Sequence, residues 1–258
     1  SCALEEHDPG YVVVATETES HLNVLQELHE LGFRNRVLVE KPLTDQDSHL
    51  EAFDFSALFV GYNFRFHPAV QTMRQLLTGQ RVLSAQIRAG QYLPDWRPGR
   101  DYQLTESVGP GGGVLLDLSH EIDLVNWLFG PAKVLFGRSV RTGTLAVENE
   151  DLAVGVLSLP QSGIASFELN YLDRTPLRQF TVTTPRSTYV LDLNSGSLRE
   201  NGEVRVPGPI DRNSVFKVMH ESALSTGDNL CDVEEAMLVV RQVLELRGLV
   251  ATSATWED

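Results

Sequence analysis

Three polar side chains recur every third residue in the segment GGGVLLDLSHEIDLVNWLFG, residues 111–130, namely Asp117, His120 and Asp123. At this spacing they can all lie along one side of a helix. An imidazole flanked by carboxylates is expected to have a defined tautomer and a raised pKa, which suits proton transfer near neutral pH. The same pattern also fits a histidine that only fills a half-buried helix face while its carboxylates contact solvent.

A lysine stands where an apolar run ends, in VLVEKPL, residues 37–43. Ligands of open α/β sheets bind outside the carboxyl ends of the strands, and Lys41 occupies such a position. Pro42 fixes the chain direction there. His21 follows the apolar run at 11–16 and can face the same crevice. A solvated lysine and a helix-surface histidine are the alternative interpretations of the same residues.

The first 64 residues predict an α/β unit that would position Lys41. Apolar runs at 11–16, 36–40 and 57–63 predict strands, and the first of these, apolar on both faces, predicts a strand that is covered on both sides. Leucines at helical spacing between residues 22 and 31 predict a helix that ends at Gly32, and a short helix is expected over 45–52. Strands alternating with helices predict a doubly wound parallel sheet.

The remainder, residues 65–258, predicts a second domain of α+β type. Helices are expected over 69–77, 114–129 and, as a closing helix, 233–247. An alternating strand at 81–90 and a succession of short strands between 133 and 206, separated by turn residues, predict a large, mainly antiparallel sheet. The loop at 93–111 is rich in proline, glycine and aromatic residues.

Composition excludes several classes of protein. A net charge of −14 disfavours a nucleic-acid partner, and no apolar run reaches the roughly 18 residues of a membrane span. Two cysteines, Cys2 and Cys231, form no disulfide framework and no zinc spacing, so a reducing cytoplasm and no metal are expected. Neither a G-x-S-x-G elbow nor a P-loop occurs, which disfavours hydrolases and nucleoside triphosphatases.

A dinucleotide-binding sheet normally begins with a strand, the turn G-x-G-x-x-G and a helix, and this sequence has no such turn. Its glycine cluster, residues 109–113, lies beyond the predicted α/β unit. Either the fold is not a Rossmann domain, or the N-terminal part of that domain lies outside this chain.

Four motifs carry a family resemblance: VVVATETESH, VLVEKPL, VGYNFRFHPAV and GGGVLLDLSHEIDLVNWLFG. In order and spacing they resemble the Gfo/Idh/MocA family of nicotinamide-dependent sugar and polyol oxidoreductases, over nearly the whole chain from residue 11 onward. The resemblance implies a partial Rossmann-type parallel sheet followed by an α+β domain. It further implies hydride transfer between NAD or NADP and a secondary hydroxyl of a sugar, nucleotide-sugar or polyol, and a homo-oligomer formed through the antiparallel sheet.

The resemblance also assigns roles to residues. Lys41 would stabilise charge on the substrate oxygen, His120 would accept the hydroxyl proton and Asp117 would orient His120 or hold the sugar. The cofactor would contact Ala15, Thr16, His21, Glu40, Lys41 and Pro42. The substrate would contact Asn63, Arg65, Tyr92, Trp96, Arg97 and Asp123. The loop YLPDWRPGRDY, with Arg100 and Tyr102, can stack on a sugar ring and bind a carboxylate or phosphate.

Two local departures from the family pattern stand in the sequence. Many members have A-T-P after the first motif strand, where this chain has Ala15-Thr16-Glu17, and many have D-x-x-x-H, where Asp117 and His120 are one residue closer. Two other functions fit the same fold. One is a binding protein that senses a sugar or dinucleotide without chemistry, and the other is an inactive fragment without a pyrophosphate site.

Overall fold

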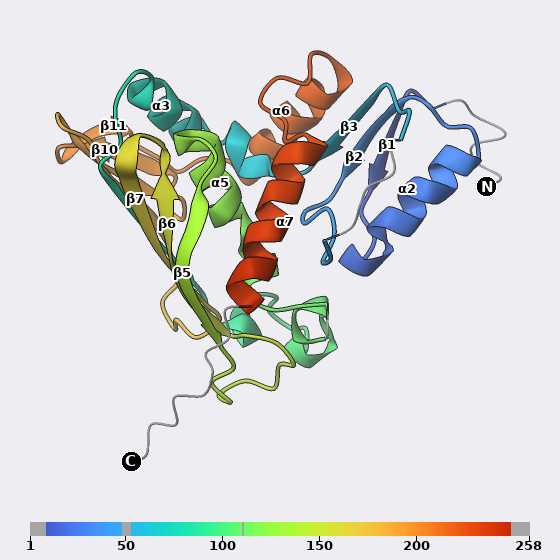
Figure 1. Cartoon of the computed structure of the whole chain (residues 1–258), viewed down its shortest axis with the longest axis horizontal. Coiled ribbons are helices and arrows are strands. Elements are labelled where there is room, and N and C mark those ends of the chain that lie inside the picture. Colours follow the sequence, from blue (N-terminus) through green and yellow to red (C-terminus); the bar gives the residue numbers. More distant parts are fainter. Residues whose placement is uncertain (1–8, 48–52, 110, 249–258) are drawn as a thin grey trace.

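Two separate sheets form the framework of the computed structural model, which describes residues 9–47, 53–109 and 111–248 (Figure 1). The small sheet contains β1 (Tyr11–Val14), β2 (Arg36–Val39) and β3 (Ala57–Val60), all parallel, in the order β1-β2-β3. Helix α2 (His21–Glu30) connects β1 to β2 and ends before Gly32, whose φ of 78° suits glycine. The predicted strand–helix–strand order of this region is confirmed.

Burial differs between the strands of the small sheet. Val37, Leu38 and Val39 of the central strand are fully buried, as a strand covered on both faces should be. Val13, on the edge strand β1, is 40% exposed. The prediction that the first strand is packed on both faces is therefore wrong for β1 in this structure. The strand that is packed on both faces is β2, which lies in the middle of the small sheet.

The large sheet has eight strands in the order β11-β10-β9-β8-β4-β7-β6-β5. All neighbours are antiparallel except β4 and β7, which run parallel. This confirms the mainly antiparallel second sheet. The strands are β4 (Ser84–Gly90), β5 (Lys133–Val140), β6 (Leu152–Leu159), β7 (Gly163–Asn170), β8 (Leu177–Thr183), β9 (Thr188–Asp192), β10 (Ser197–Glu200) and β11 (Glu203–Val206).

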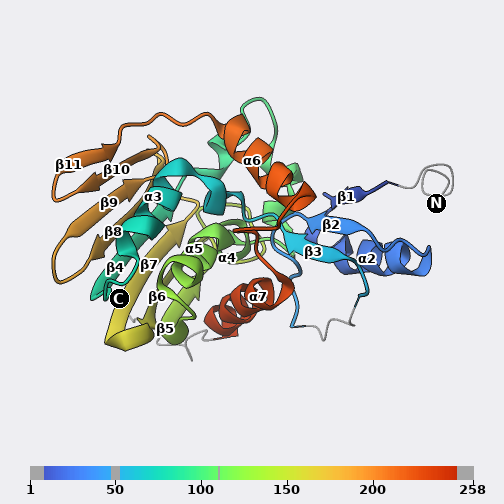
Figure 2. The same ribbon diagram turned by 90° about the horizontal axis from the view of Figure 1, so that it is seen from above.

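Helices cover one face of the large sheet, as the two views show (Figures 1 and 2). Helix α3 (Pro68–Leu77) packs on β9, β10 and β11, whereas α7 (Val233–Gly248) packs on β5 and also reaches β3 of the small sheet. Gly137 and Gly155 face each other across β5 and β6, and a Cβ atom on Gly137 would collide with Leu246 of α7. The two glycines thus let α7 lie close to the sheet.

The expected helix over 114–129 is two helices. Helix α4 (Val114–Asp117) ends at Leu118, whose φ of −99° and ψ of 27° depart from helical values, and α5 (Ser119–Phe129) follows at once. The break separates Asp117 from His120 and Asp123, which keep their three-residue spacing on α5. The structure also contains α6 (Arg212–Leu224), a helix that the sequence patterns did not predict.

The short helix expected over 45–52 is absent where it can be checked. Residues 45–47 are not helical, and residues 48–52 lie outside the described part of the chain. The division into domains 1–64 and 65–258 stays a prediction, with the 3-10 turn η2 (Asn63–Phe66) lying at the proposed boundary.

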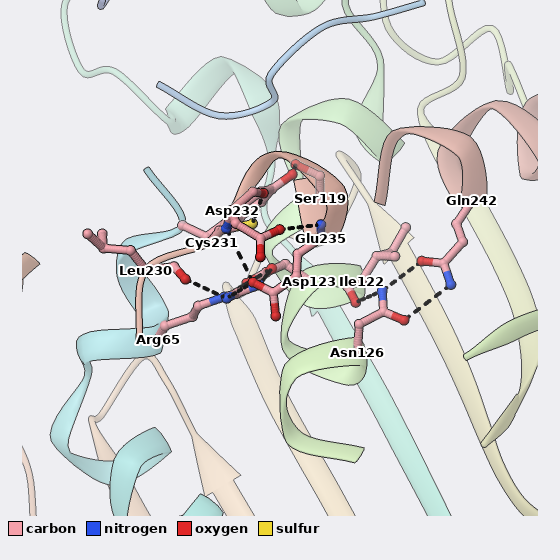
Figure 3. Close-up of polar contacts among 11 residues, drawn as sticks. Arg65, Ser119, Ile122, Asp123, Asn126, Leu230, Cys231, Asp232, Glu235 and Gln242 are labelled. Atoms are coloured by element: carbon pink, nitrogen blue, oxygen red, sulfur yellow. Dashed lines mark hydrogen bonds and ion pairs between the residues drawn. The ribbon is translucent and has the colours of Figure 1, made fainter. Parts of the chain in front are cut away.

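A buried ion pair joins the segments around the centre of the molecule (Figure 3). The Arg65 guanidinium donates to both carboxylate oxygens of Asp123, with Nη2 at 2.6 Å from Oδ1, and each of the two residues is 1% exposed. Its Nη1 donates to the Leu230 carbonyl oxygen and to Glu235 Oε2, at 3.2 and 2.6 Å. Arg65 therefore holds η2, α5 and the start of α7 together.

We expect Asp123→Ala to lower the free energy of unfolding by about 3 kcal/mol, because it leaves the Arg65 guanidinium buried with only a partly exposed partner. Urea unfolding followed by circular dichroism measures the loss. Arg241→Ala removes an exposed ion pair with Asp47 and is the control, with an expected change below about 1 kcal/mol. Equal losses in the two variants would contradict a structural role for the buried pair.

Candidate active site

A cavity of about 790 Å³ opens where β2 and β4 end and β8 begins. Its wall brings together segments far apart in the sequence: the turn after β2, η2, the loop after β4, the α4–α5 junction, β8 and the start of α6. The volume is within the range of small-molecule sites in proteins. Lys41, Asp117 and His120, the three predicted catalytic residues, all lie on this wall.

Lys41 reaches across from the small sheet to the α4–α5 junction. Its Nζ donates to the Asp117 carbonyl oxygen at 2.8 Å. Burial lowers the pKa of Lys41, while the Asp117 carboxylate opposes that shift. The ammonium group is thus positioned by a backbone acceptor on the other half of the molecule.

His120 lies between aromatic rings and carries a free lone-pair position. Its ring centroid is 5.5 Å from that of Tyr62 and 4.7 Å from that of Phe64. Nδ1 is buried and has no hydrogen-bond partner among the described residues. Buried polar atoms are rarely left without a partner, so the His120 ring has hydrogen-bonding capacity that the described residues do not use.

The pKa of His120 is lowered well below its ordinary value, chiefly by burial and then by the charges of Lys41, Arg178 and Arg212. The prediction of a raised pKa is wrong. It assumed that carboxylates one turn away face the imidazole, whereas Asp123 pairs with Arg65. A lowered pKa keeps the imidazole neutral at pH 7, the form that accepts a proton.

Asp117 is held by a tyrosine from the large sheet. The Tyr171 hydroxyl donates to Asp117 Oδ2 at 2.6 Å, and Tyr171 is fully buried. Burial and the Asp117 charge raise the pKa of Tyr171 well above its ordinary value, so its hydroxyl stays a donor. Among the described residues no hydrogen bond joins Asp117 and His120, so Tyr171, which directly follows β7, is the residue that orients this carboxylate.

Two arginines on the wall were not predicted. Arg178 comes from β8, where its Nε lies 2.6 Å from Glu121 Oε1 and its guanidinium carbon lies 4.8 Å from the centre of the Phe64 ring. Arg212 is the first residue of α6. Neither stands in a motif, so only the alternation of LRQFTVT, which gives Arg178 a definite side of its strand, carried any signal.

The predicted substrate residues divide into two groups. Asn63, Trp96 and Arg97 lie on the cavity wall, together with Arg100 and Tyr102 from the same loop. Tyr92, Arg65 and Asp123 do not. The Tyr92 ring is covered by the Arg174 guanidinium at 3.4 Å, and Arg65 and Asp123 satisfy each other inside the protein. The structure gives these last two a role in packing instead of contact with substrate.

The predicted cofactor residues gather at the ends of β1 and β2. Glu40 and Lys41 line the cavity, whereas Ala15 and Thr16 are exposed beyond β1. The buried His21 ring joins the two strand ends, with Nδ1 3.0 Å from the Pro42 carbonyl oxygen and Nε2 3.1 Å from that of Thr16. The tertiary structure thus brings all six predicted cofactor residues to one edge of the small sheet.

Within residues 9–47, 53–109 and 111–248, no three metal-ligating side chains cluster, and no helix is long and apolar enough to cross a membrane.

Comparisons with known proteins agree with the predicted family. The family model of the GFO/IDH/MocA C-terminal domain matches residues 70–190. This match covers the middle of the chain and agrees with the family that its motifs resemble. A sequence comparison with curated proteins found no match.

Solved structures share the fold of nearly the whole chain. UDP-N-acetylglucosamine 3-dehydrogenase GnnA from Acidithiobacillus ferrooxidans superposes with a TM-score of 0.74 at 20% identity, over 93% of this chain and 78% of that one. A levoglucosan dehydrogenase in complex with NADH and levoglucosan has a TM-score of 0.77 at 16% identity, over 96% of this chain and 80% of that one. An oxidoreductase domain protein from Kribbella flavida has a TM-score of 0.76 at 18% identity, over 96% of this chain and 80% of that one. At these identities the likeness establishes the fold.

The lowered pKa of His120 predicts a contribution to the pH dependence of stability. Below about 6.5, the ordinary histidine pKa, the unfolded chain binds a proton that the folded protein does not, so stability falls as the pH falls. We expect His120→Gln to lose less stability than the unmodified protein between pH 7 and pH 5, measured by urea unfolding at each pH. Parallel stability profiles would mean that His120 titrates alike in both states.

Proposed function

We propose that this chain is an NAD- or NADP-dependent oxidoreductase that moves a hydride between the nicotinamide and a secondary hydroxyl carbon of a sugar, nucleotide-sugar or polyol. The observation that carries the proposal is the joint position of Lys41 and His120 on one cavity wall, a cation beside a neutral, unpartnered imidazole nitrogen. Oxidation of an alcohol needs both a proton acceptor and a stabiliser of charge on oxygen.

In the oxidative direction, the substrate hydroxyl would donate its hydrogen bond to the unprotonated ring nitrogen of His120. The proton passes to that nitrogen as the C–H bond breaks, and the Lys41 ammonium stabilises the negative charge that develops on the oxygen. Asp117 fixes the position of Lys41 through its carbonyl oxygen and, held by Tyr171, presents its carboxylate to other sugar hydroxyls. In the reductive direction, protonated His120 returns the proton.

The residues at the small-sheet edge fit the nicotinamide end of the cofactor. Ala15 and Thr16 are exposed just after β1, and Lys41, after β2, lies on the same cavity wall as His120. The neutral imidazole of His120, on the cavity wall, supplies a proton acceptor for a substrate placed against that edge. When bound, a nicotinamide accepts or supplies the hydride. The sequence has no G-x-G-x-x-G turn for the pyrophosphate, so we assign only the nicotinamide end to these residues.

The similar structures support a sugar-type substrate. One is named UDP-N-acetylglucosamine 3-dehydrogenase, and another is a complex with NADH and levoglucosan. Trp96 and Tyr102 on the cavity wall supply the aromatic surface on which a sugar ring can pack. A sensor without chemistry is the other candidate, but it would need neither a neutral imidazole nor an ammonium group beside it.

We expect Lys41→Ala and His120→Ala each to lower kcat by at least about 100-fold while the fold is retained. Turnover is followed by nicotinamide absorbance with levoglucosan and with UDP-N-acetylglucosamine, using both cofactors, and circular dichroism checks the fold. Lys133→Ala, at an exposed position on β5, is the matched control and should keep full activity. Normal turnover in both site variants would exclude this mechanism, and cofactor binding without turnover in the unmodified protein would favour the sensor.

We also propose that two copies associate through the large sheet, on the face opposite the helices. Phe136 and Val204 are 59% and 49% exposed there, near the two edges of the sheet. They belong to one cross-strand row in which Val156 and Val190 alternate with polar residues, namely Ser166, Gln86, Thr181 and Arg199. A flat face that mixes apolar and polar side chains can pair with its own copy.

Sedimentation velocity should then show a dimer or larger oligomer, and Phe136→Glu should shift it to the monomer, because a charge would be buried in the apolar contact. Leu104→Glu is the control, because Leu104 is more exposed than Phe136 but lies in the loop between β4 and α4, away from this face. A monomeric unmodified protein would contradict this association.

A further inference from the structure

The cavity collects positive charge in a protein that is strongly negative. Five cationic side chains lie on its wall, namely Lys41, Arg97, Arg100, Arg178 and Arg212, against two carboxylates, Glu40 and Asp117. The whole chain has 21 lysines and arginines against 35 acidic residues and a net charge of −14. This local reversal of sign indicates a site for an anion.

Most of this charge is not neutralised by the protein itself. Asp117 already accepts from Tyr171. Arg178 is paired with the buried Glu121, with its Nε 2.6 Å from Oε1 and its Nη2 donating to Oε2 at 3.3 Å, so that Nη1 is the nitrogen it can offer to a ligand. Arg97, Arg100 and Arg212 form no ion pair with any residue in the described part of the chain. Three guanidinium groups thus remain available to a ligand.

Two of the arginines lie close to the proposed proton acceptor. The Arg178 guanidinium carbon is 4.8 Å from the centre of the Phe64 ring, and the His120 ring centre is 4.7 Å from that same centre. The charges of Arg178 and Arg212 both contribute to the lowered pKa of His120. Arg97 and Arg100 come from the loop that also brings Trp96 to the wall.

We propose that Arg178 and Arg212 form an anion subsite beside the reacting carbon, so that the substrate is a sugar carrying a carboxylate or a phosphate. This inference rests on the proposed oxidoreductase function and narrows its substrate. A planar guanidinium donates two parallel hydrogen bonds to either group, which gives both energy and orientation. Arg97 and Arg100 extend the positive wall for an anion farther from the ring.

The first test measures binding without cofactor or turnover. Isothermal titration compares D-glucose, D-glucuronate and α-D-glucose 1-phosphate, which share a ring and differ in charge. We expect an anionic probe to bind at least about tenfold more tightly than glucose, with an affinity that falls between about 0.02 M and about 0.2 M NaCl. Preference for glucuronate or for the phosphate identifies the anion, and equal binding of all three probes overturns the proposal.

Arg212→Gln is the decisive variant, because Arg212 is exposed and lacks an ion-pair partner among the described residues, so the fold should be unaffected. This variant should bind the preferred anionic probe about tenfold more weakly and bind glucose with unchanged affinity. Lys217→Gln, on the same helix but away from the cavity, also removes one positive charge and should change the affinity for neither probe. Equal losses of affinity for the anionic probe in both variants would mean a general charge effect and would overturn the proposed subsite.

Arg178→Gln is a second variant, and the fold must be checked for it because Glu121 would then be buried without its partner. Competition by NADH alone against the anionic probe would assign the arginines to the cofactor instead and would overturn the proposal. The two hypotheses can be tested separately. Turnover of a neutral sugar without any preference for anions would contradict only the anion subsite. Specific binding of an anion without any turnover would contradict only the oxidoreductase function.

Discussion

The need to pair one buried guanidinium organises the centre of this molecule. Arg65 is 1% exposed, and a charge so far from water is tolerated only when carboxylates and carbonyl oxygens surround it. Those acceptors come from α5, from the Leu230 carbonyl and from Glu235 in the first turn of α7. Because α5 also carries His120 and η2 also carries Asn63, satisfying Arg65 fixes two walls of the cavity at once.

Electrostatics within the cavity follow from this arrangement. Asp123 is engaged with Arg65 and therefore cannot raise the pKa of His120, while Lys41, Arg178 and Arg212 lower it. An imidazole kept neutral by burial and by neighbouring cations is a proton acceptor at pH 7, and the same cations attract an anionic ligand. One cluster of positive charge thus serves both the proposed chemistry and the proposed choice of substrate.

Much of the fold could be predicted because local patterns dominate it. The short aliphatic run at 36–39 favours a buried strand, and the turn-separated strands after residue 133 favour a mainly antiparallel sheet. Lys41 was found because a strand end is a fixed position in a parallel sheet. The break at Leu118 and the helix α6 were missed, since the periodicity of 114–129 continues through the break and α6 has a weakly apolar sequence.

The sequence alone determined the two-part α/β and α+β architecture, the family resemblance and the identity of the lysine and histidine on the cavity wall. Only the tertiary structure decided what each charge faces. It separated Asp123 from His120, gave Asp117 to Tyr171 and added Arg178 and Arg212 from β8 and α6. The physical reason is that hydrophobic periodicity is local along the chain, whereas ion pairing and desolvation depend on groups that only folding brings together.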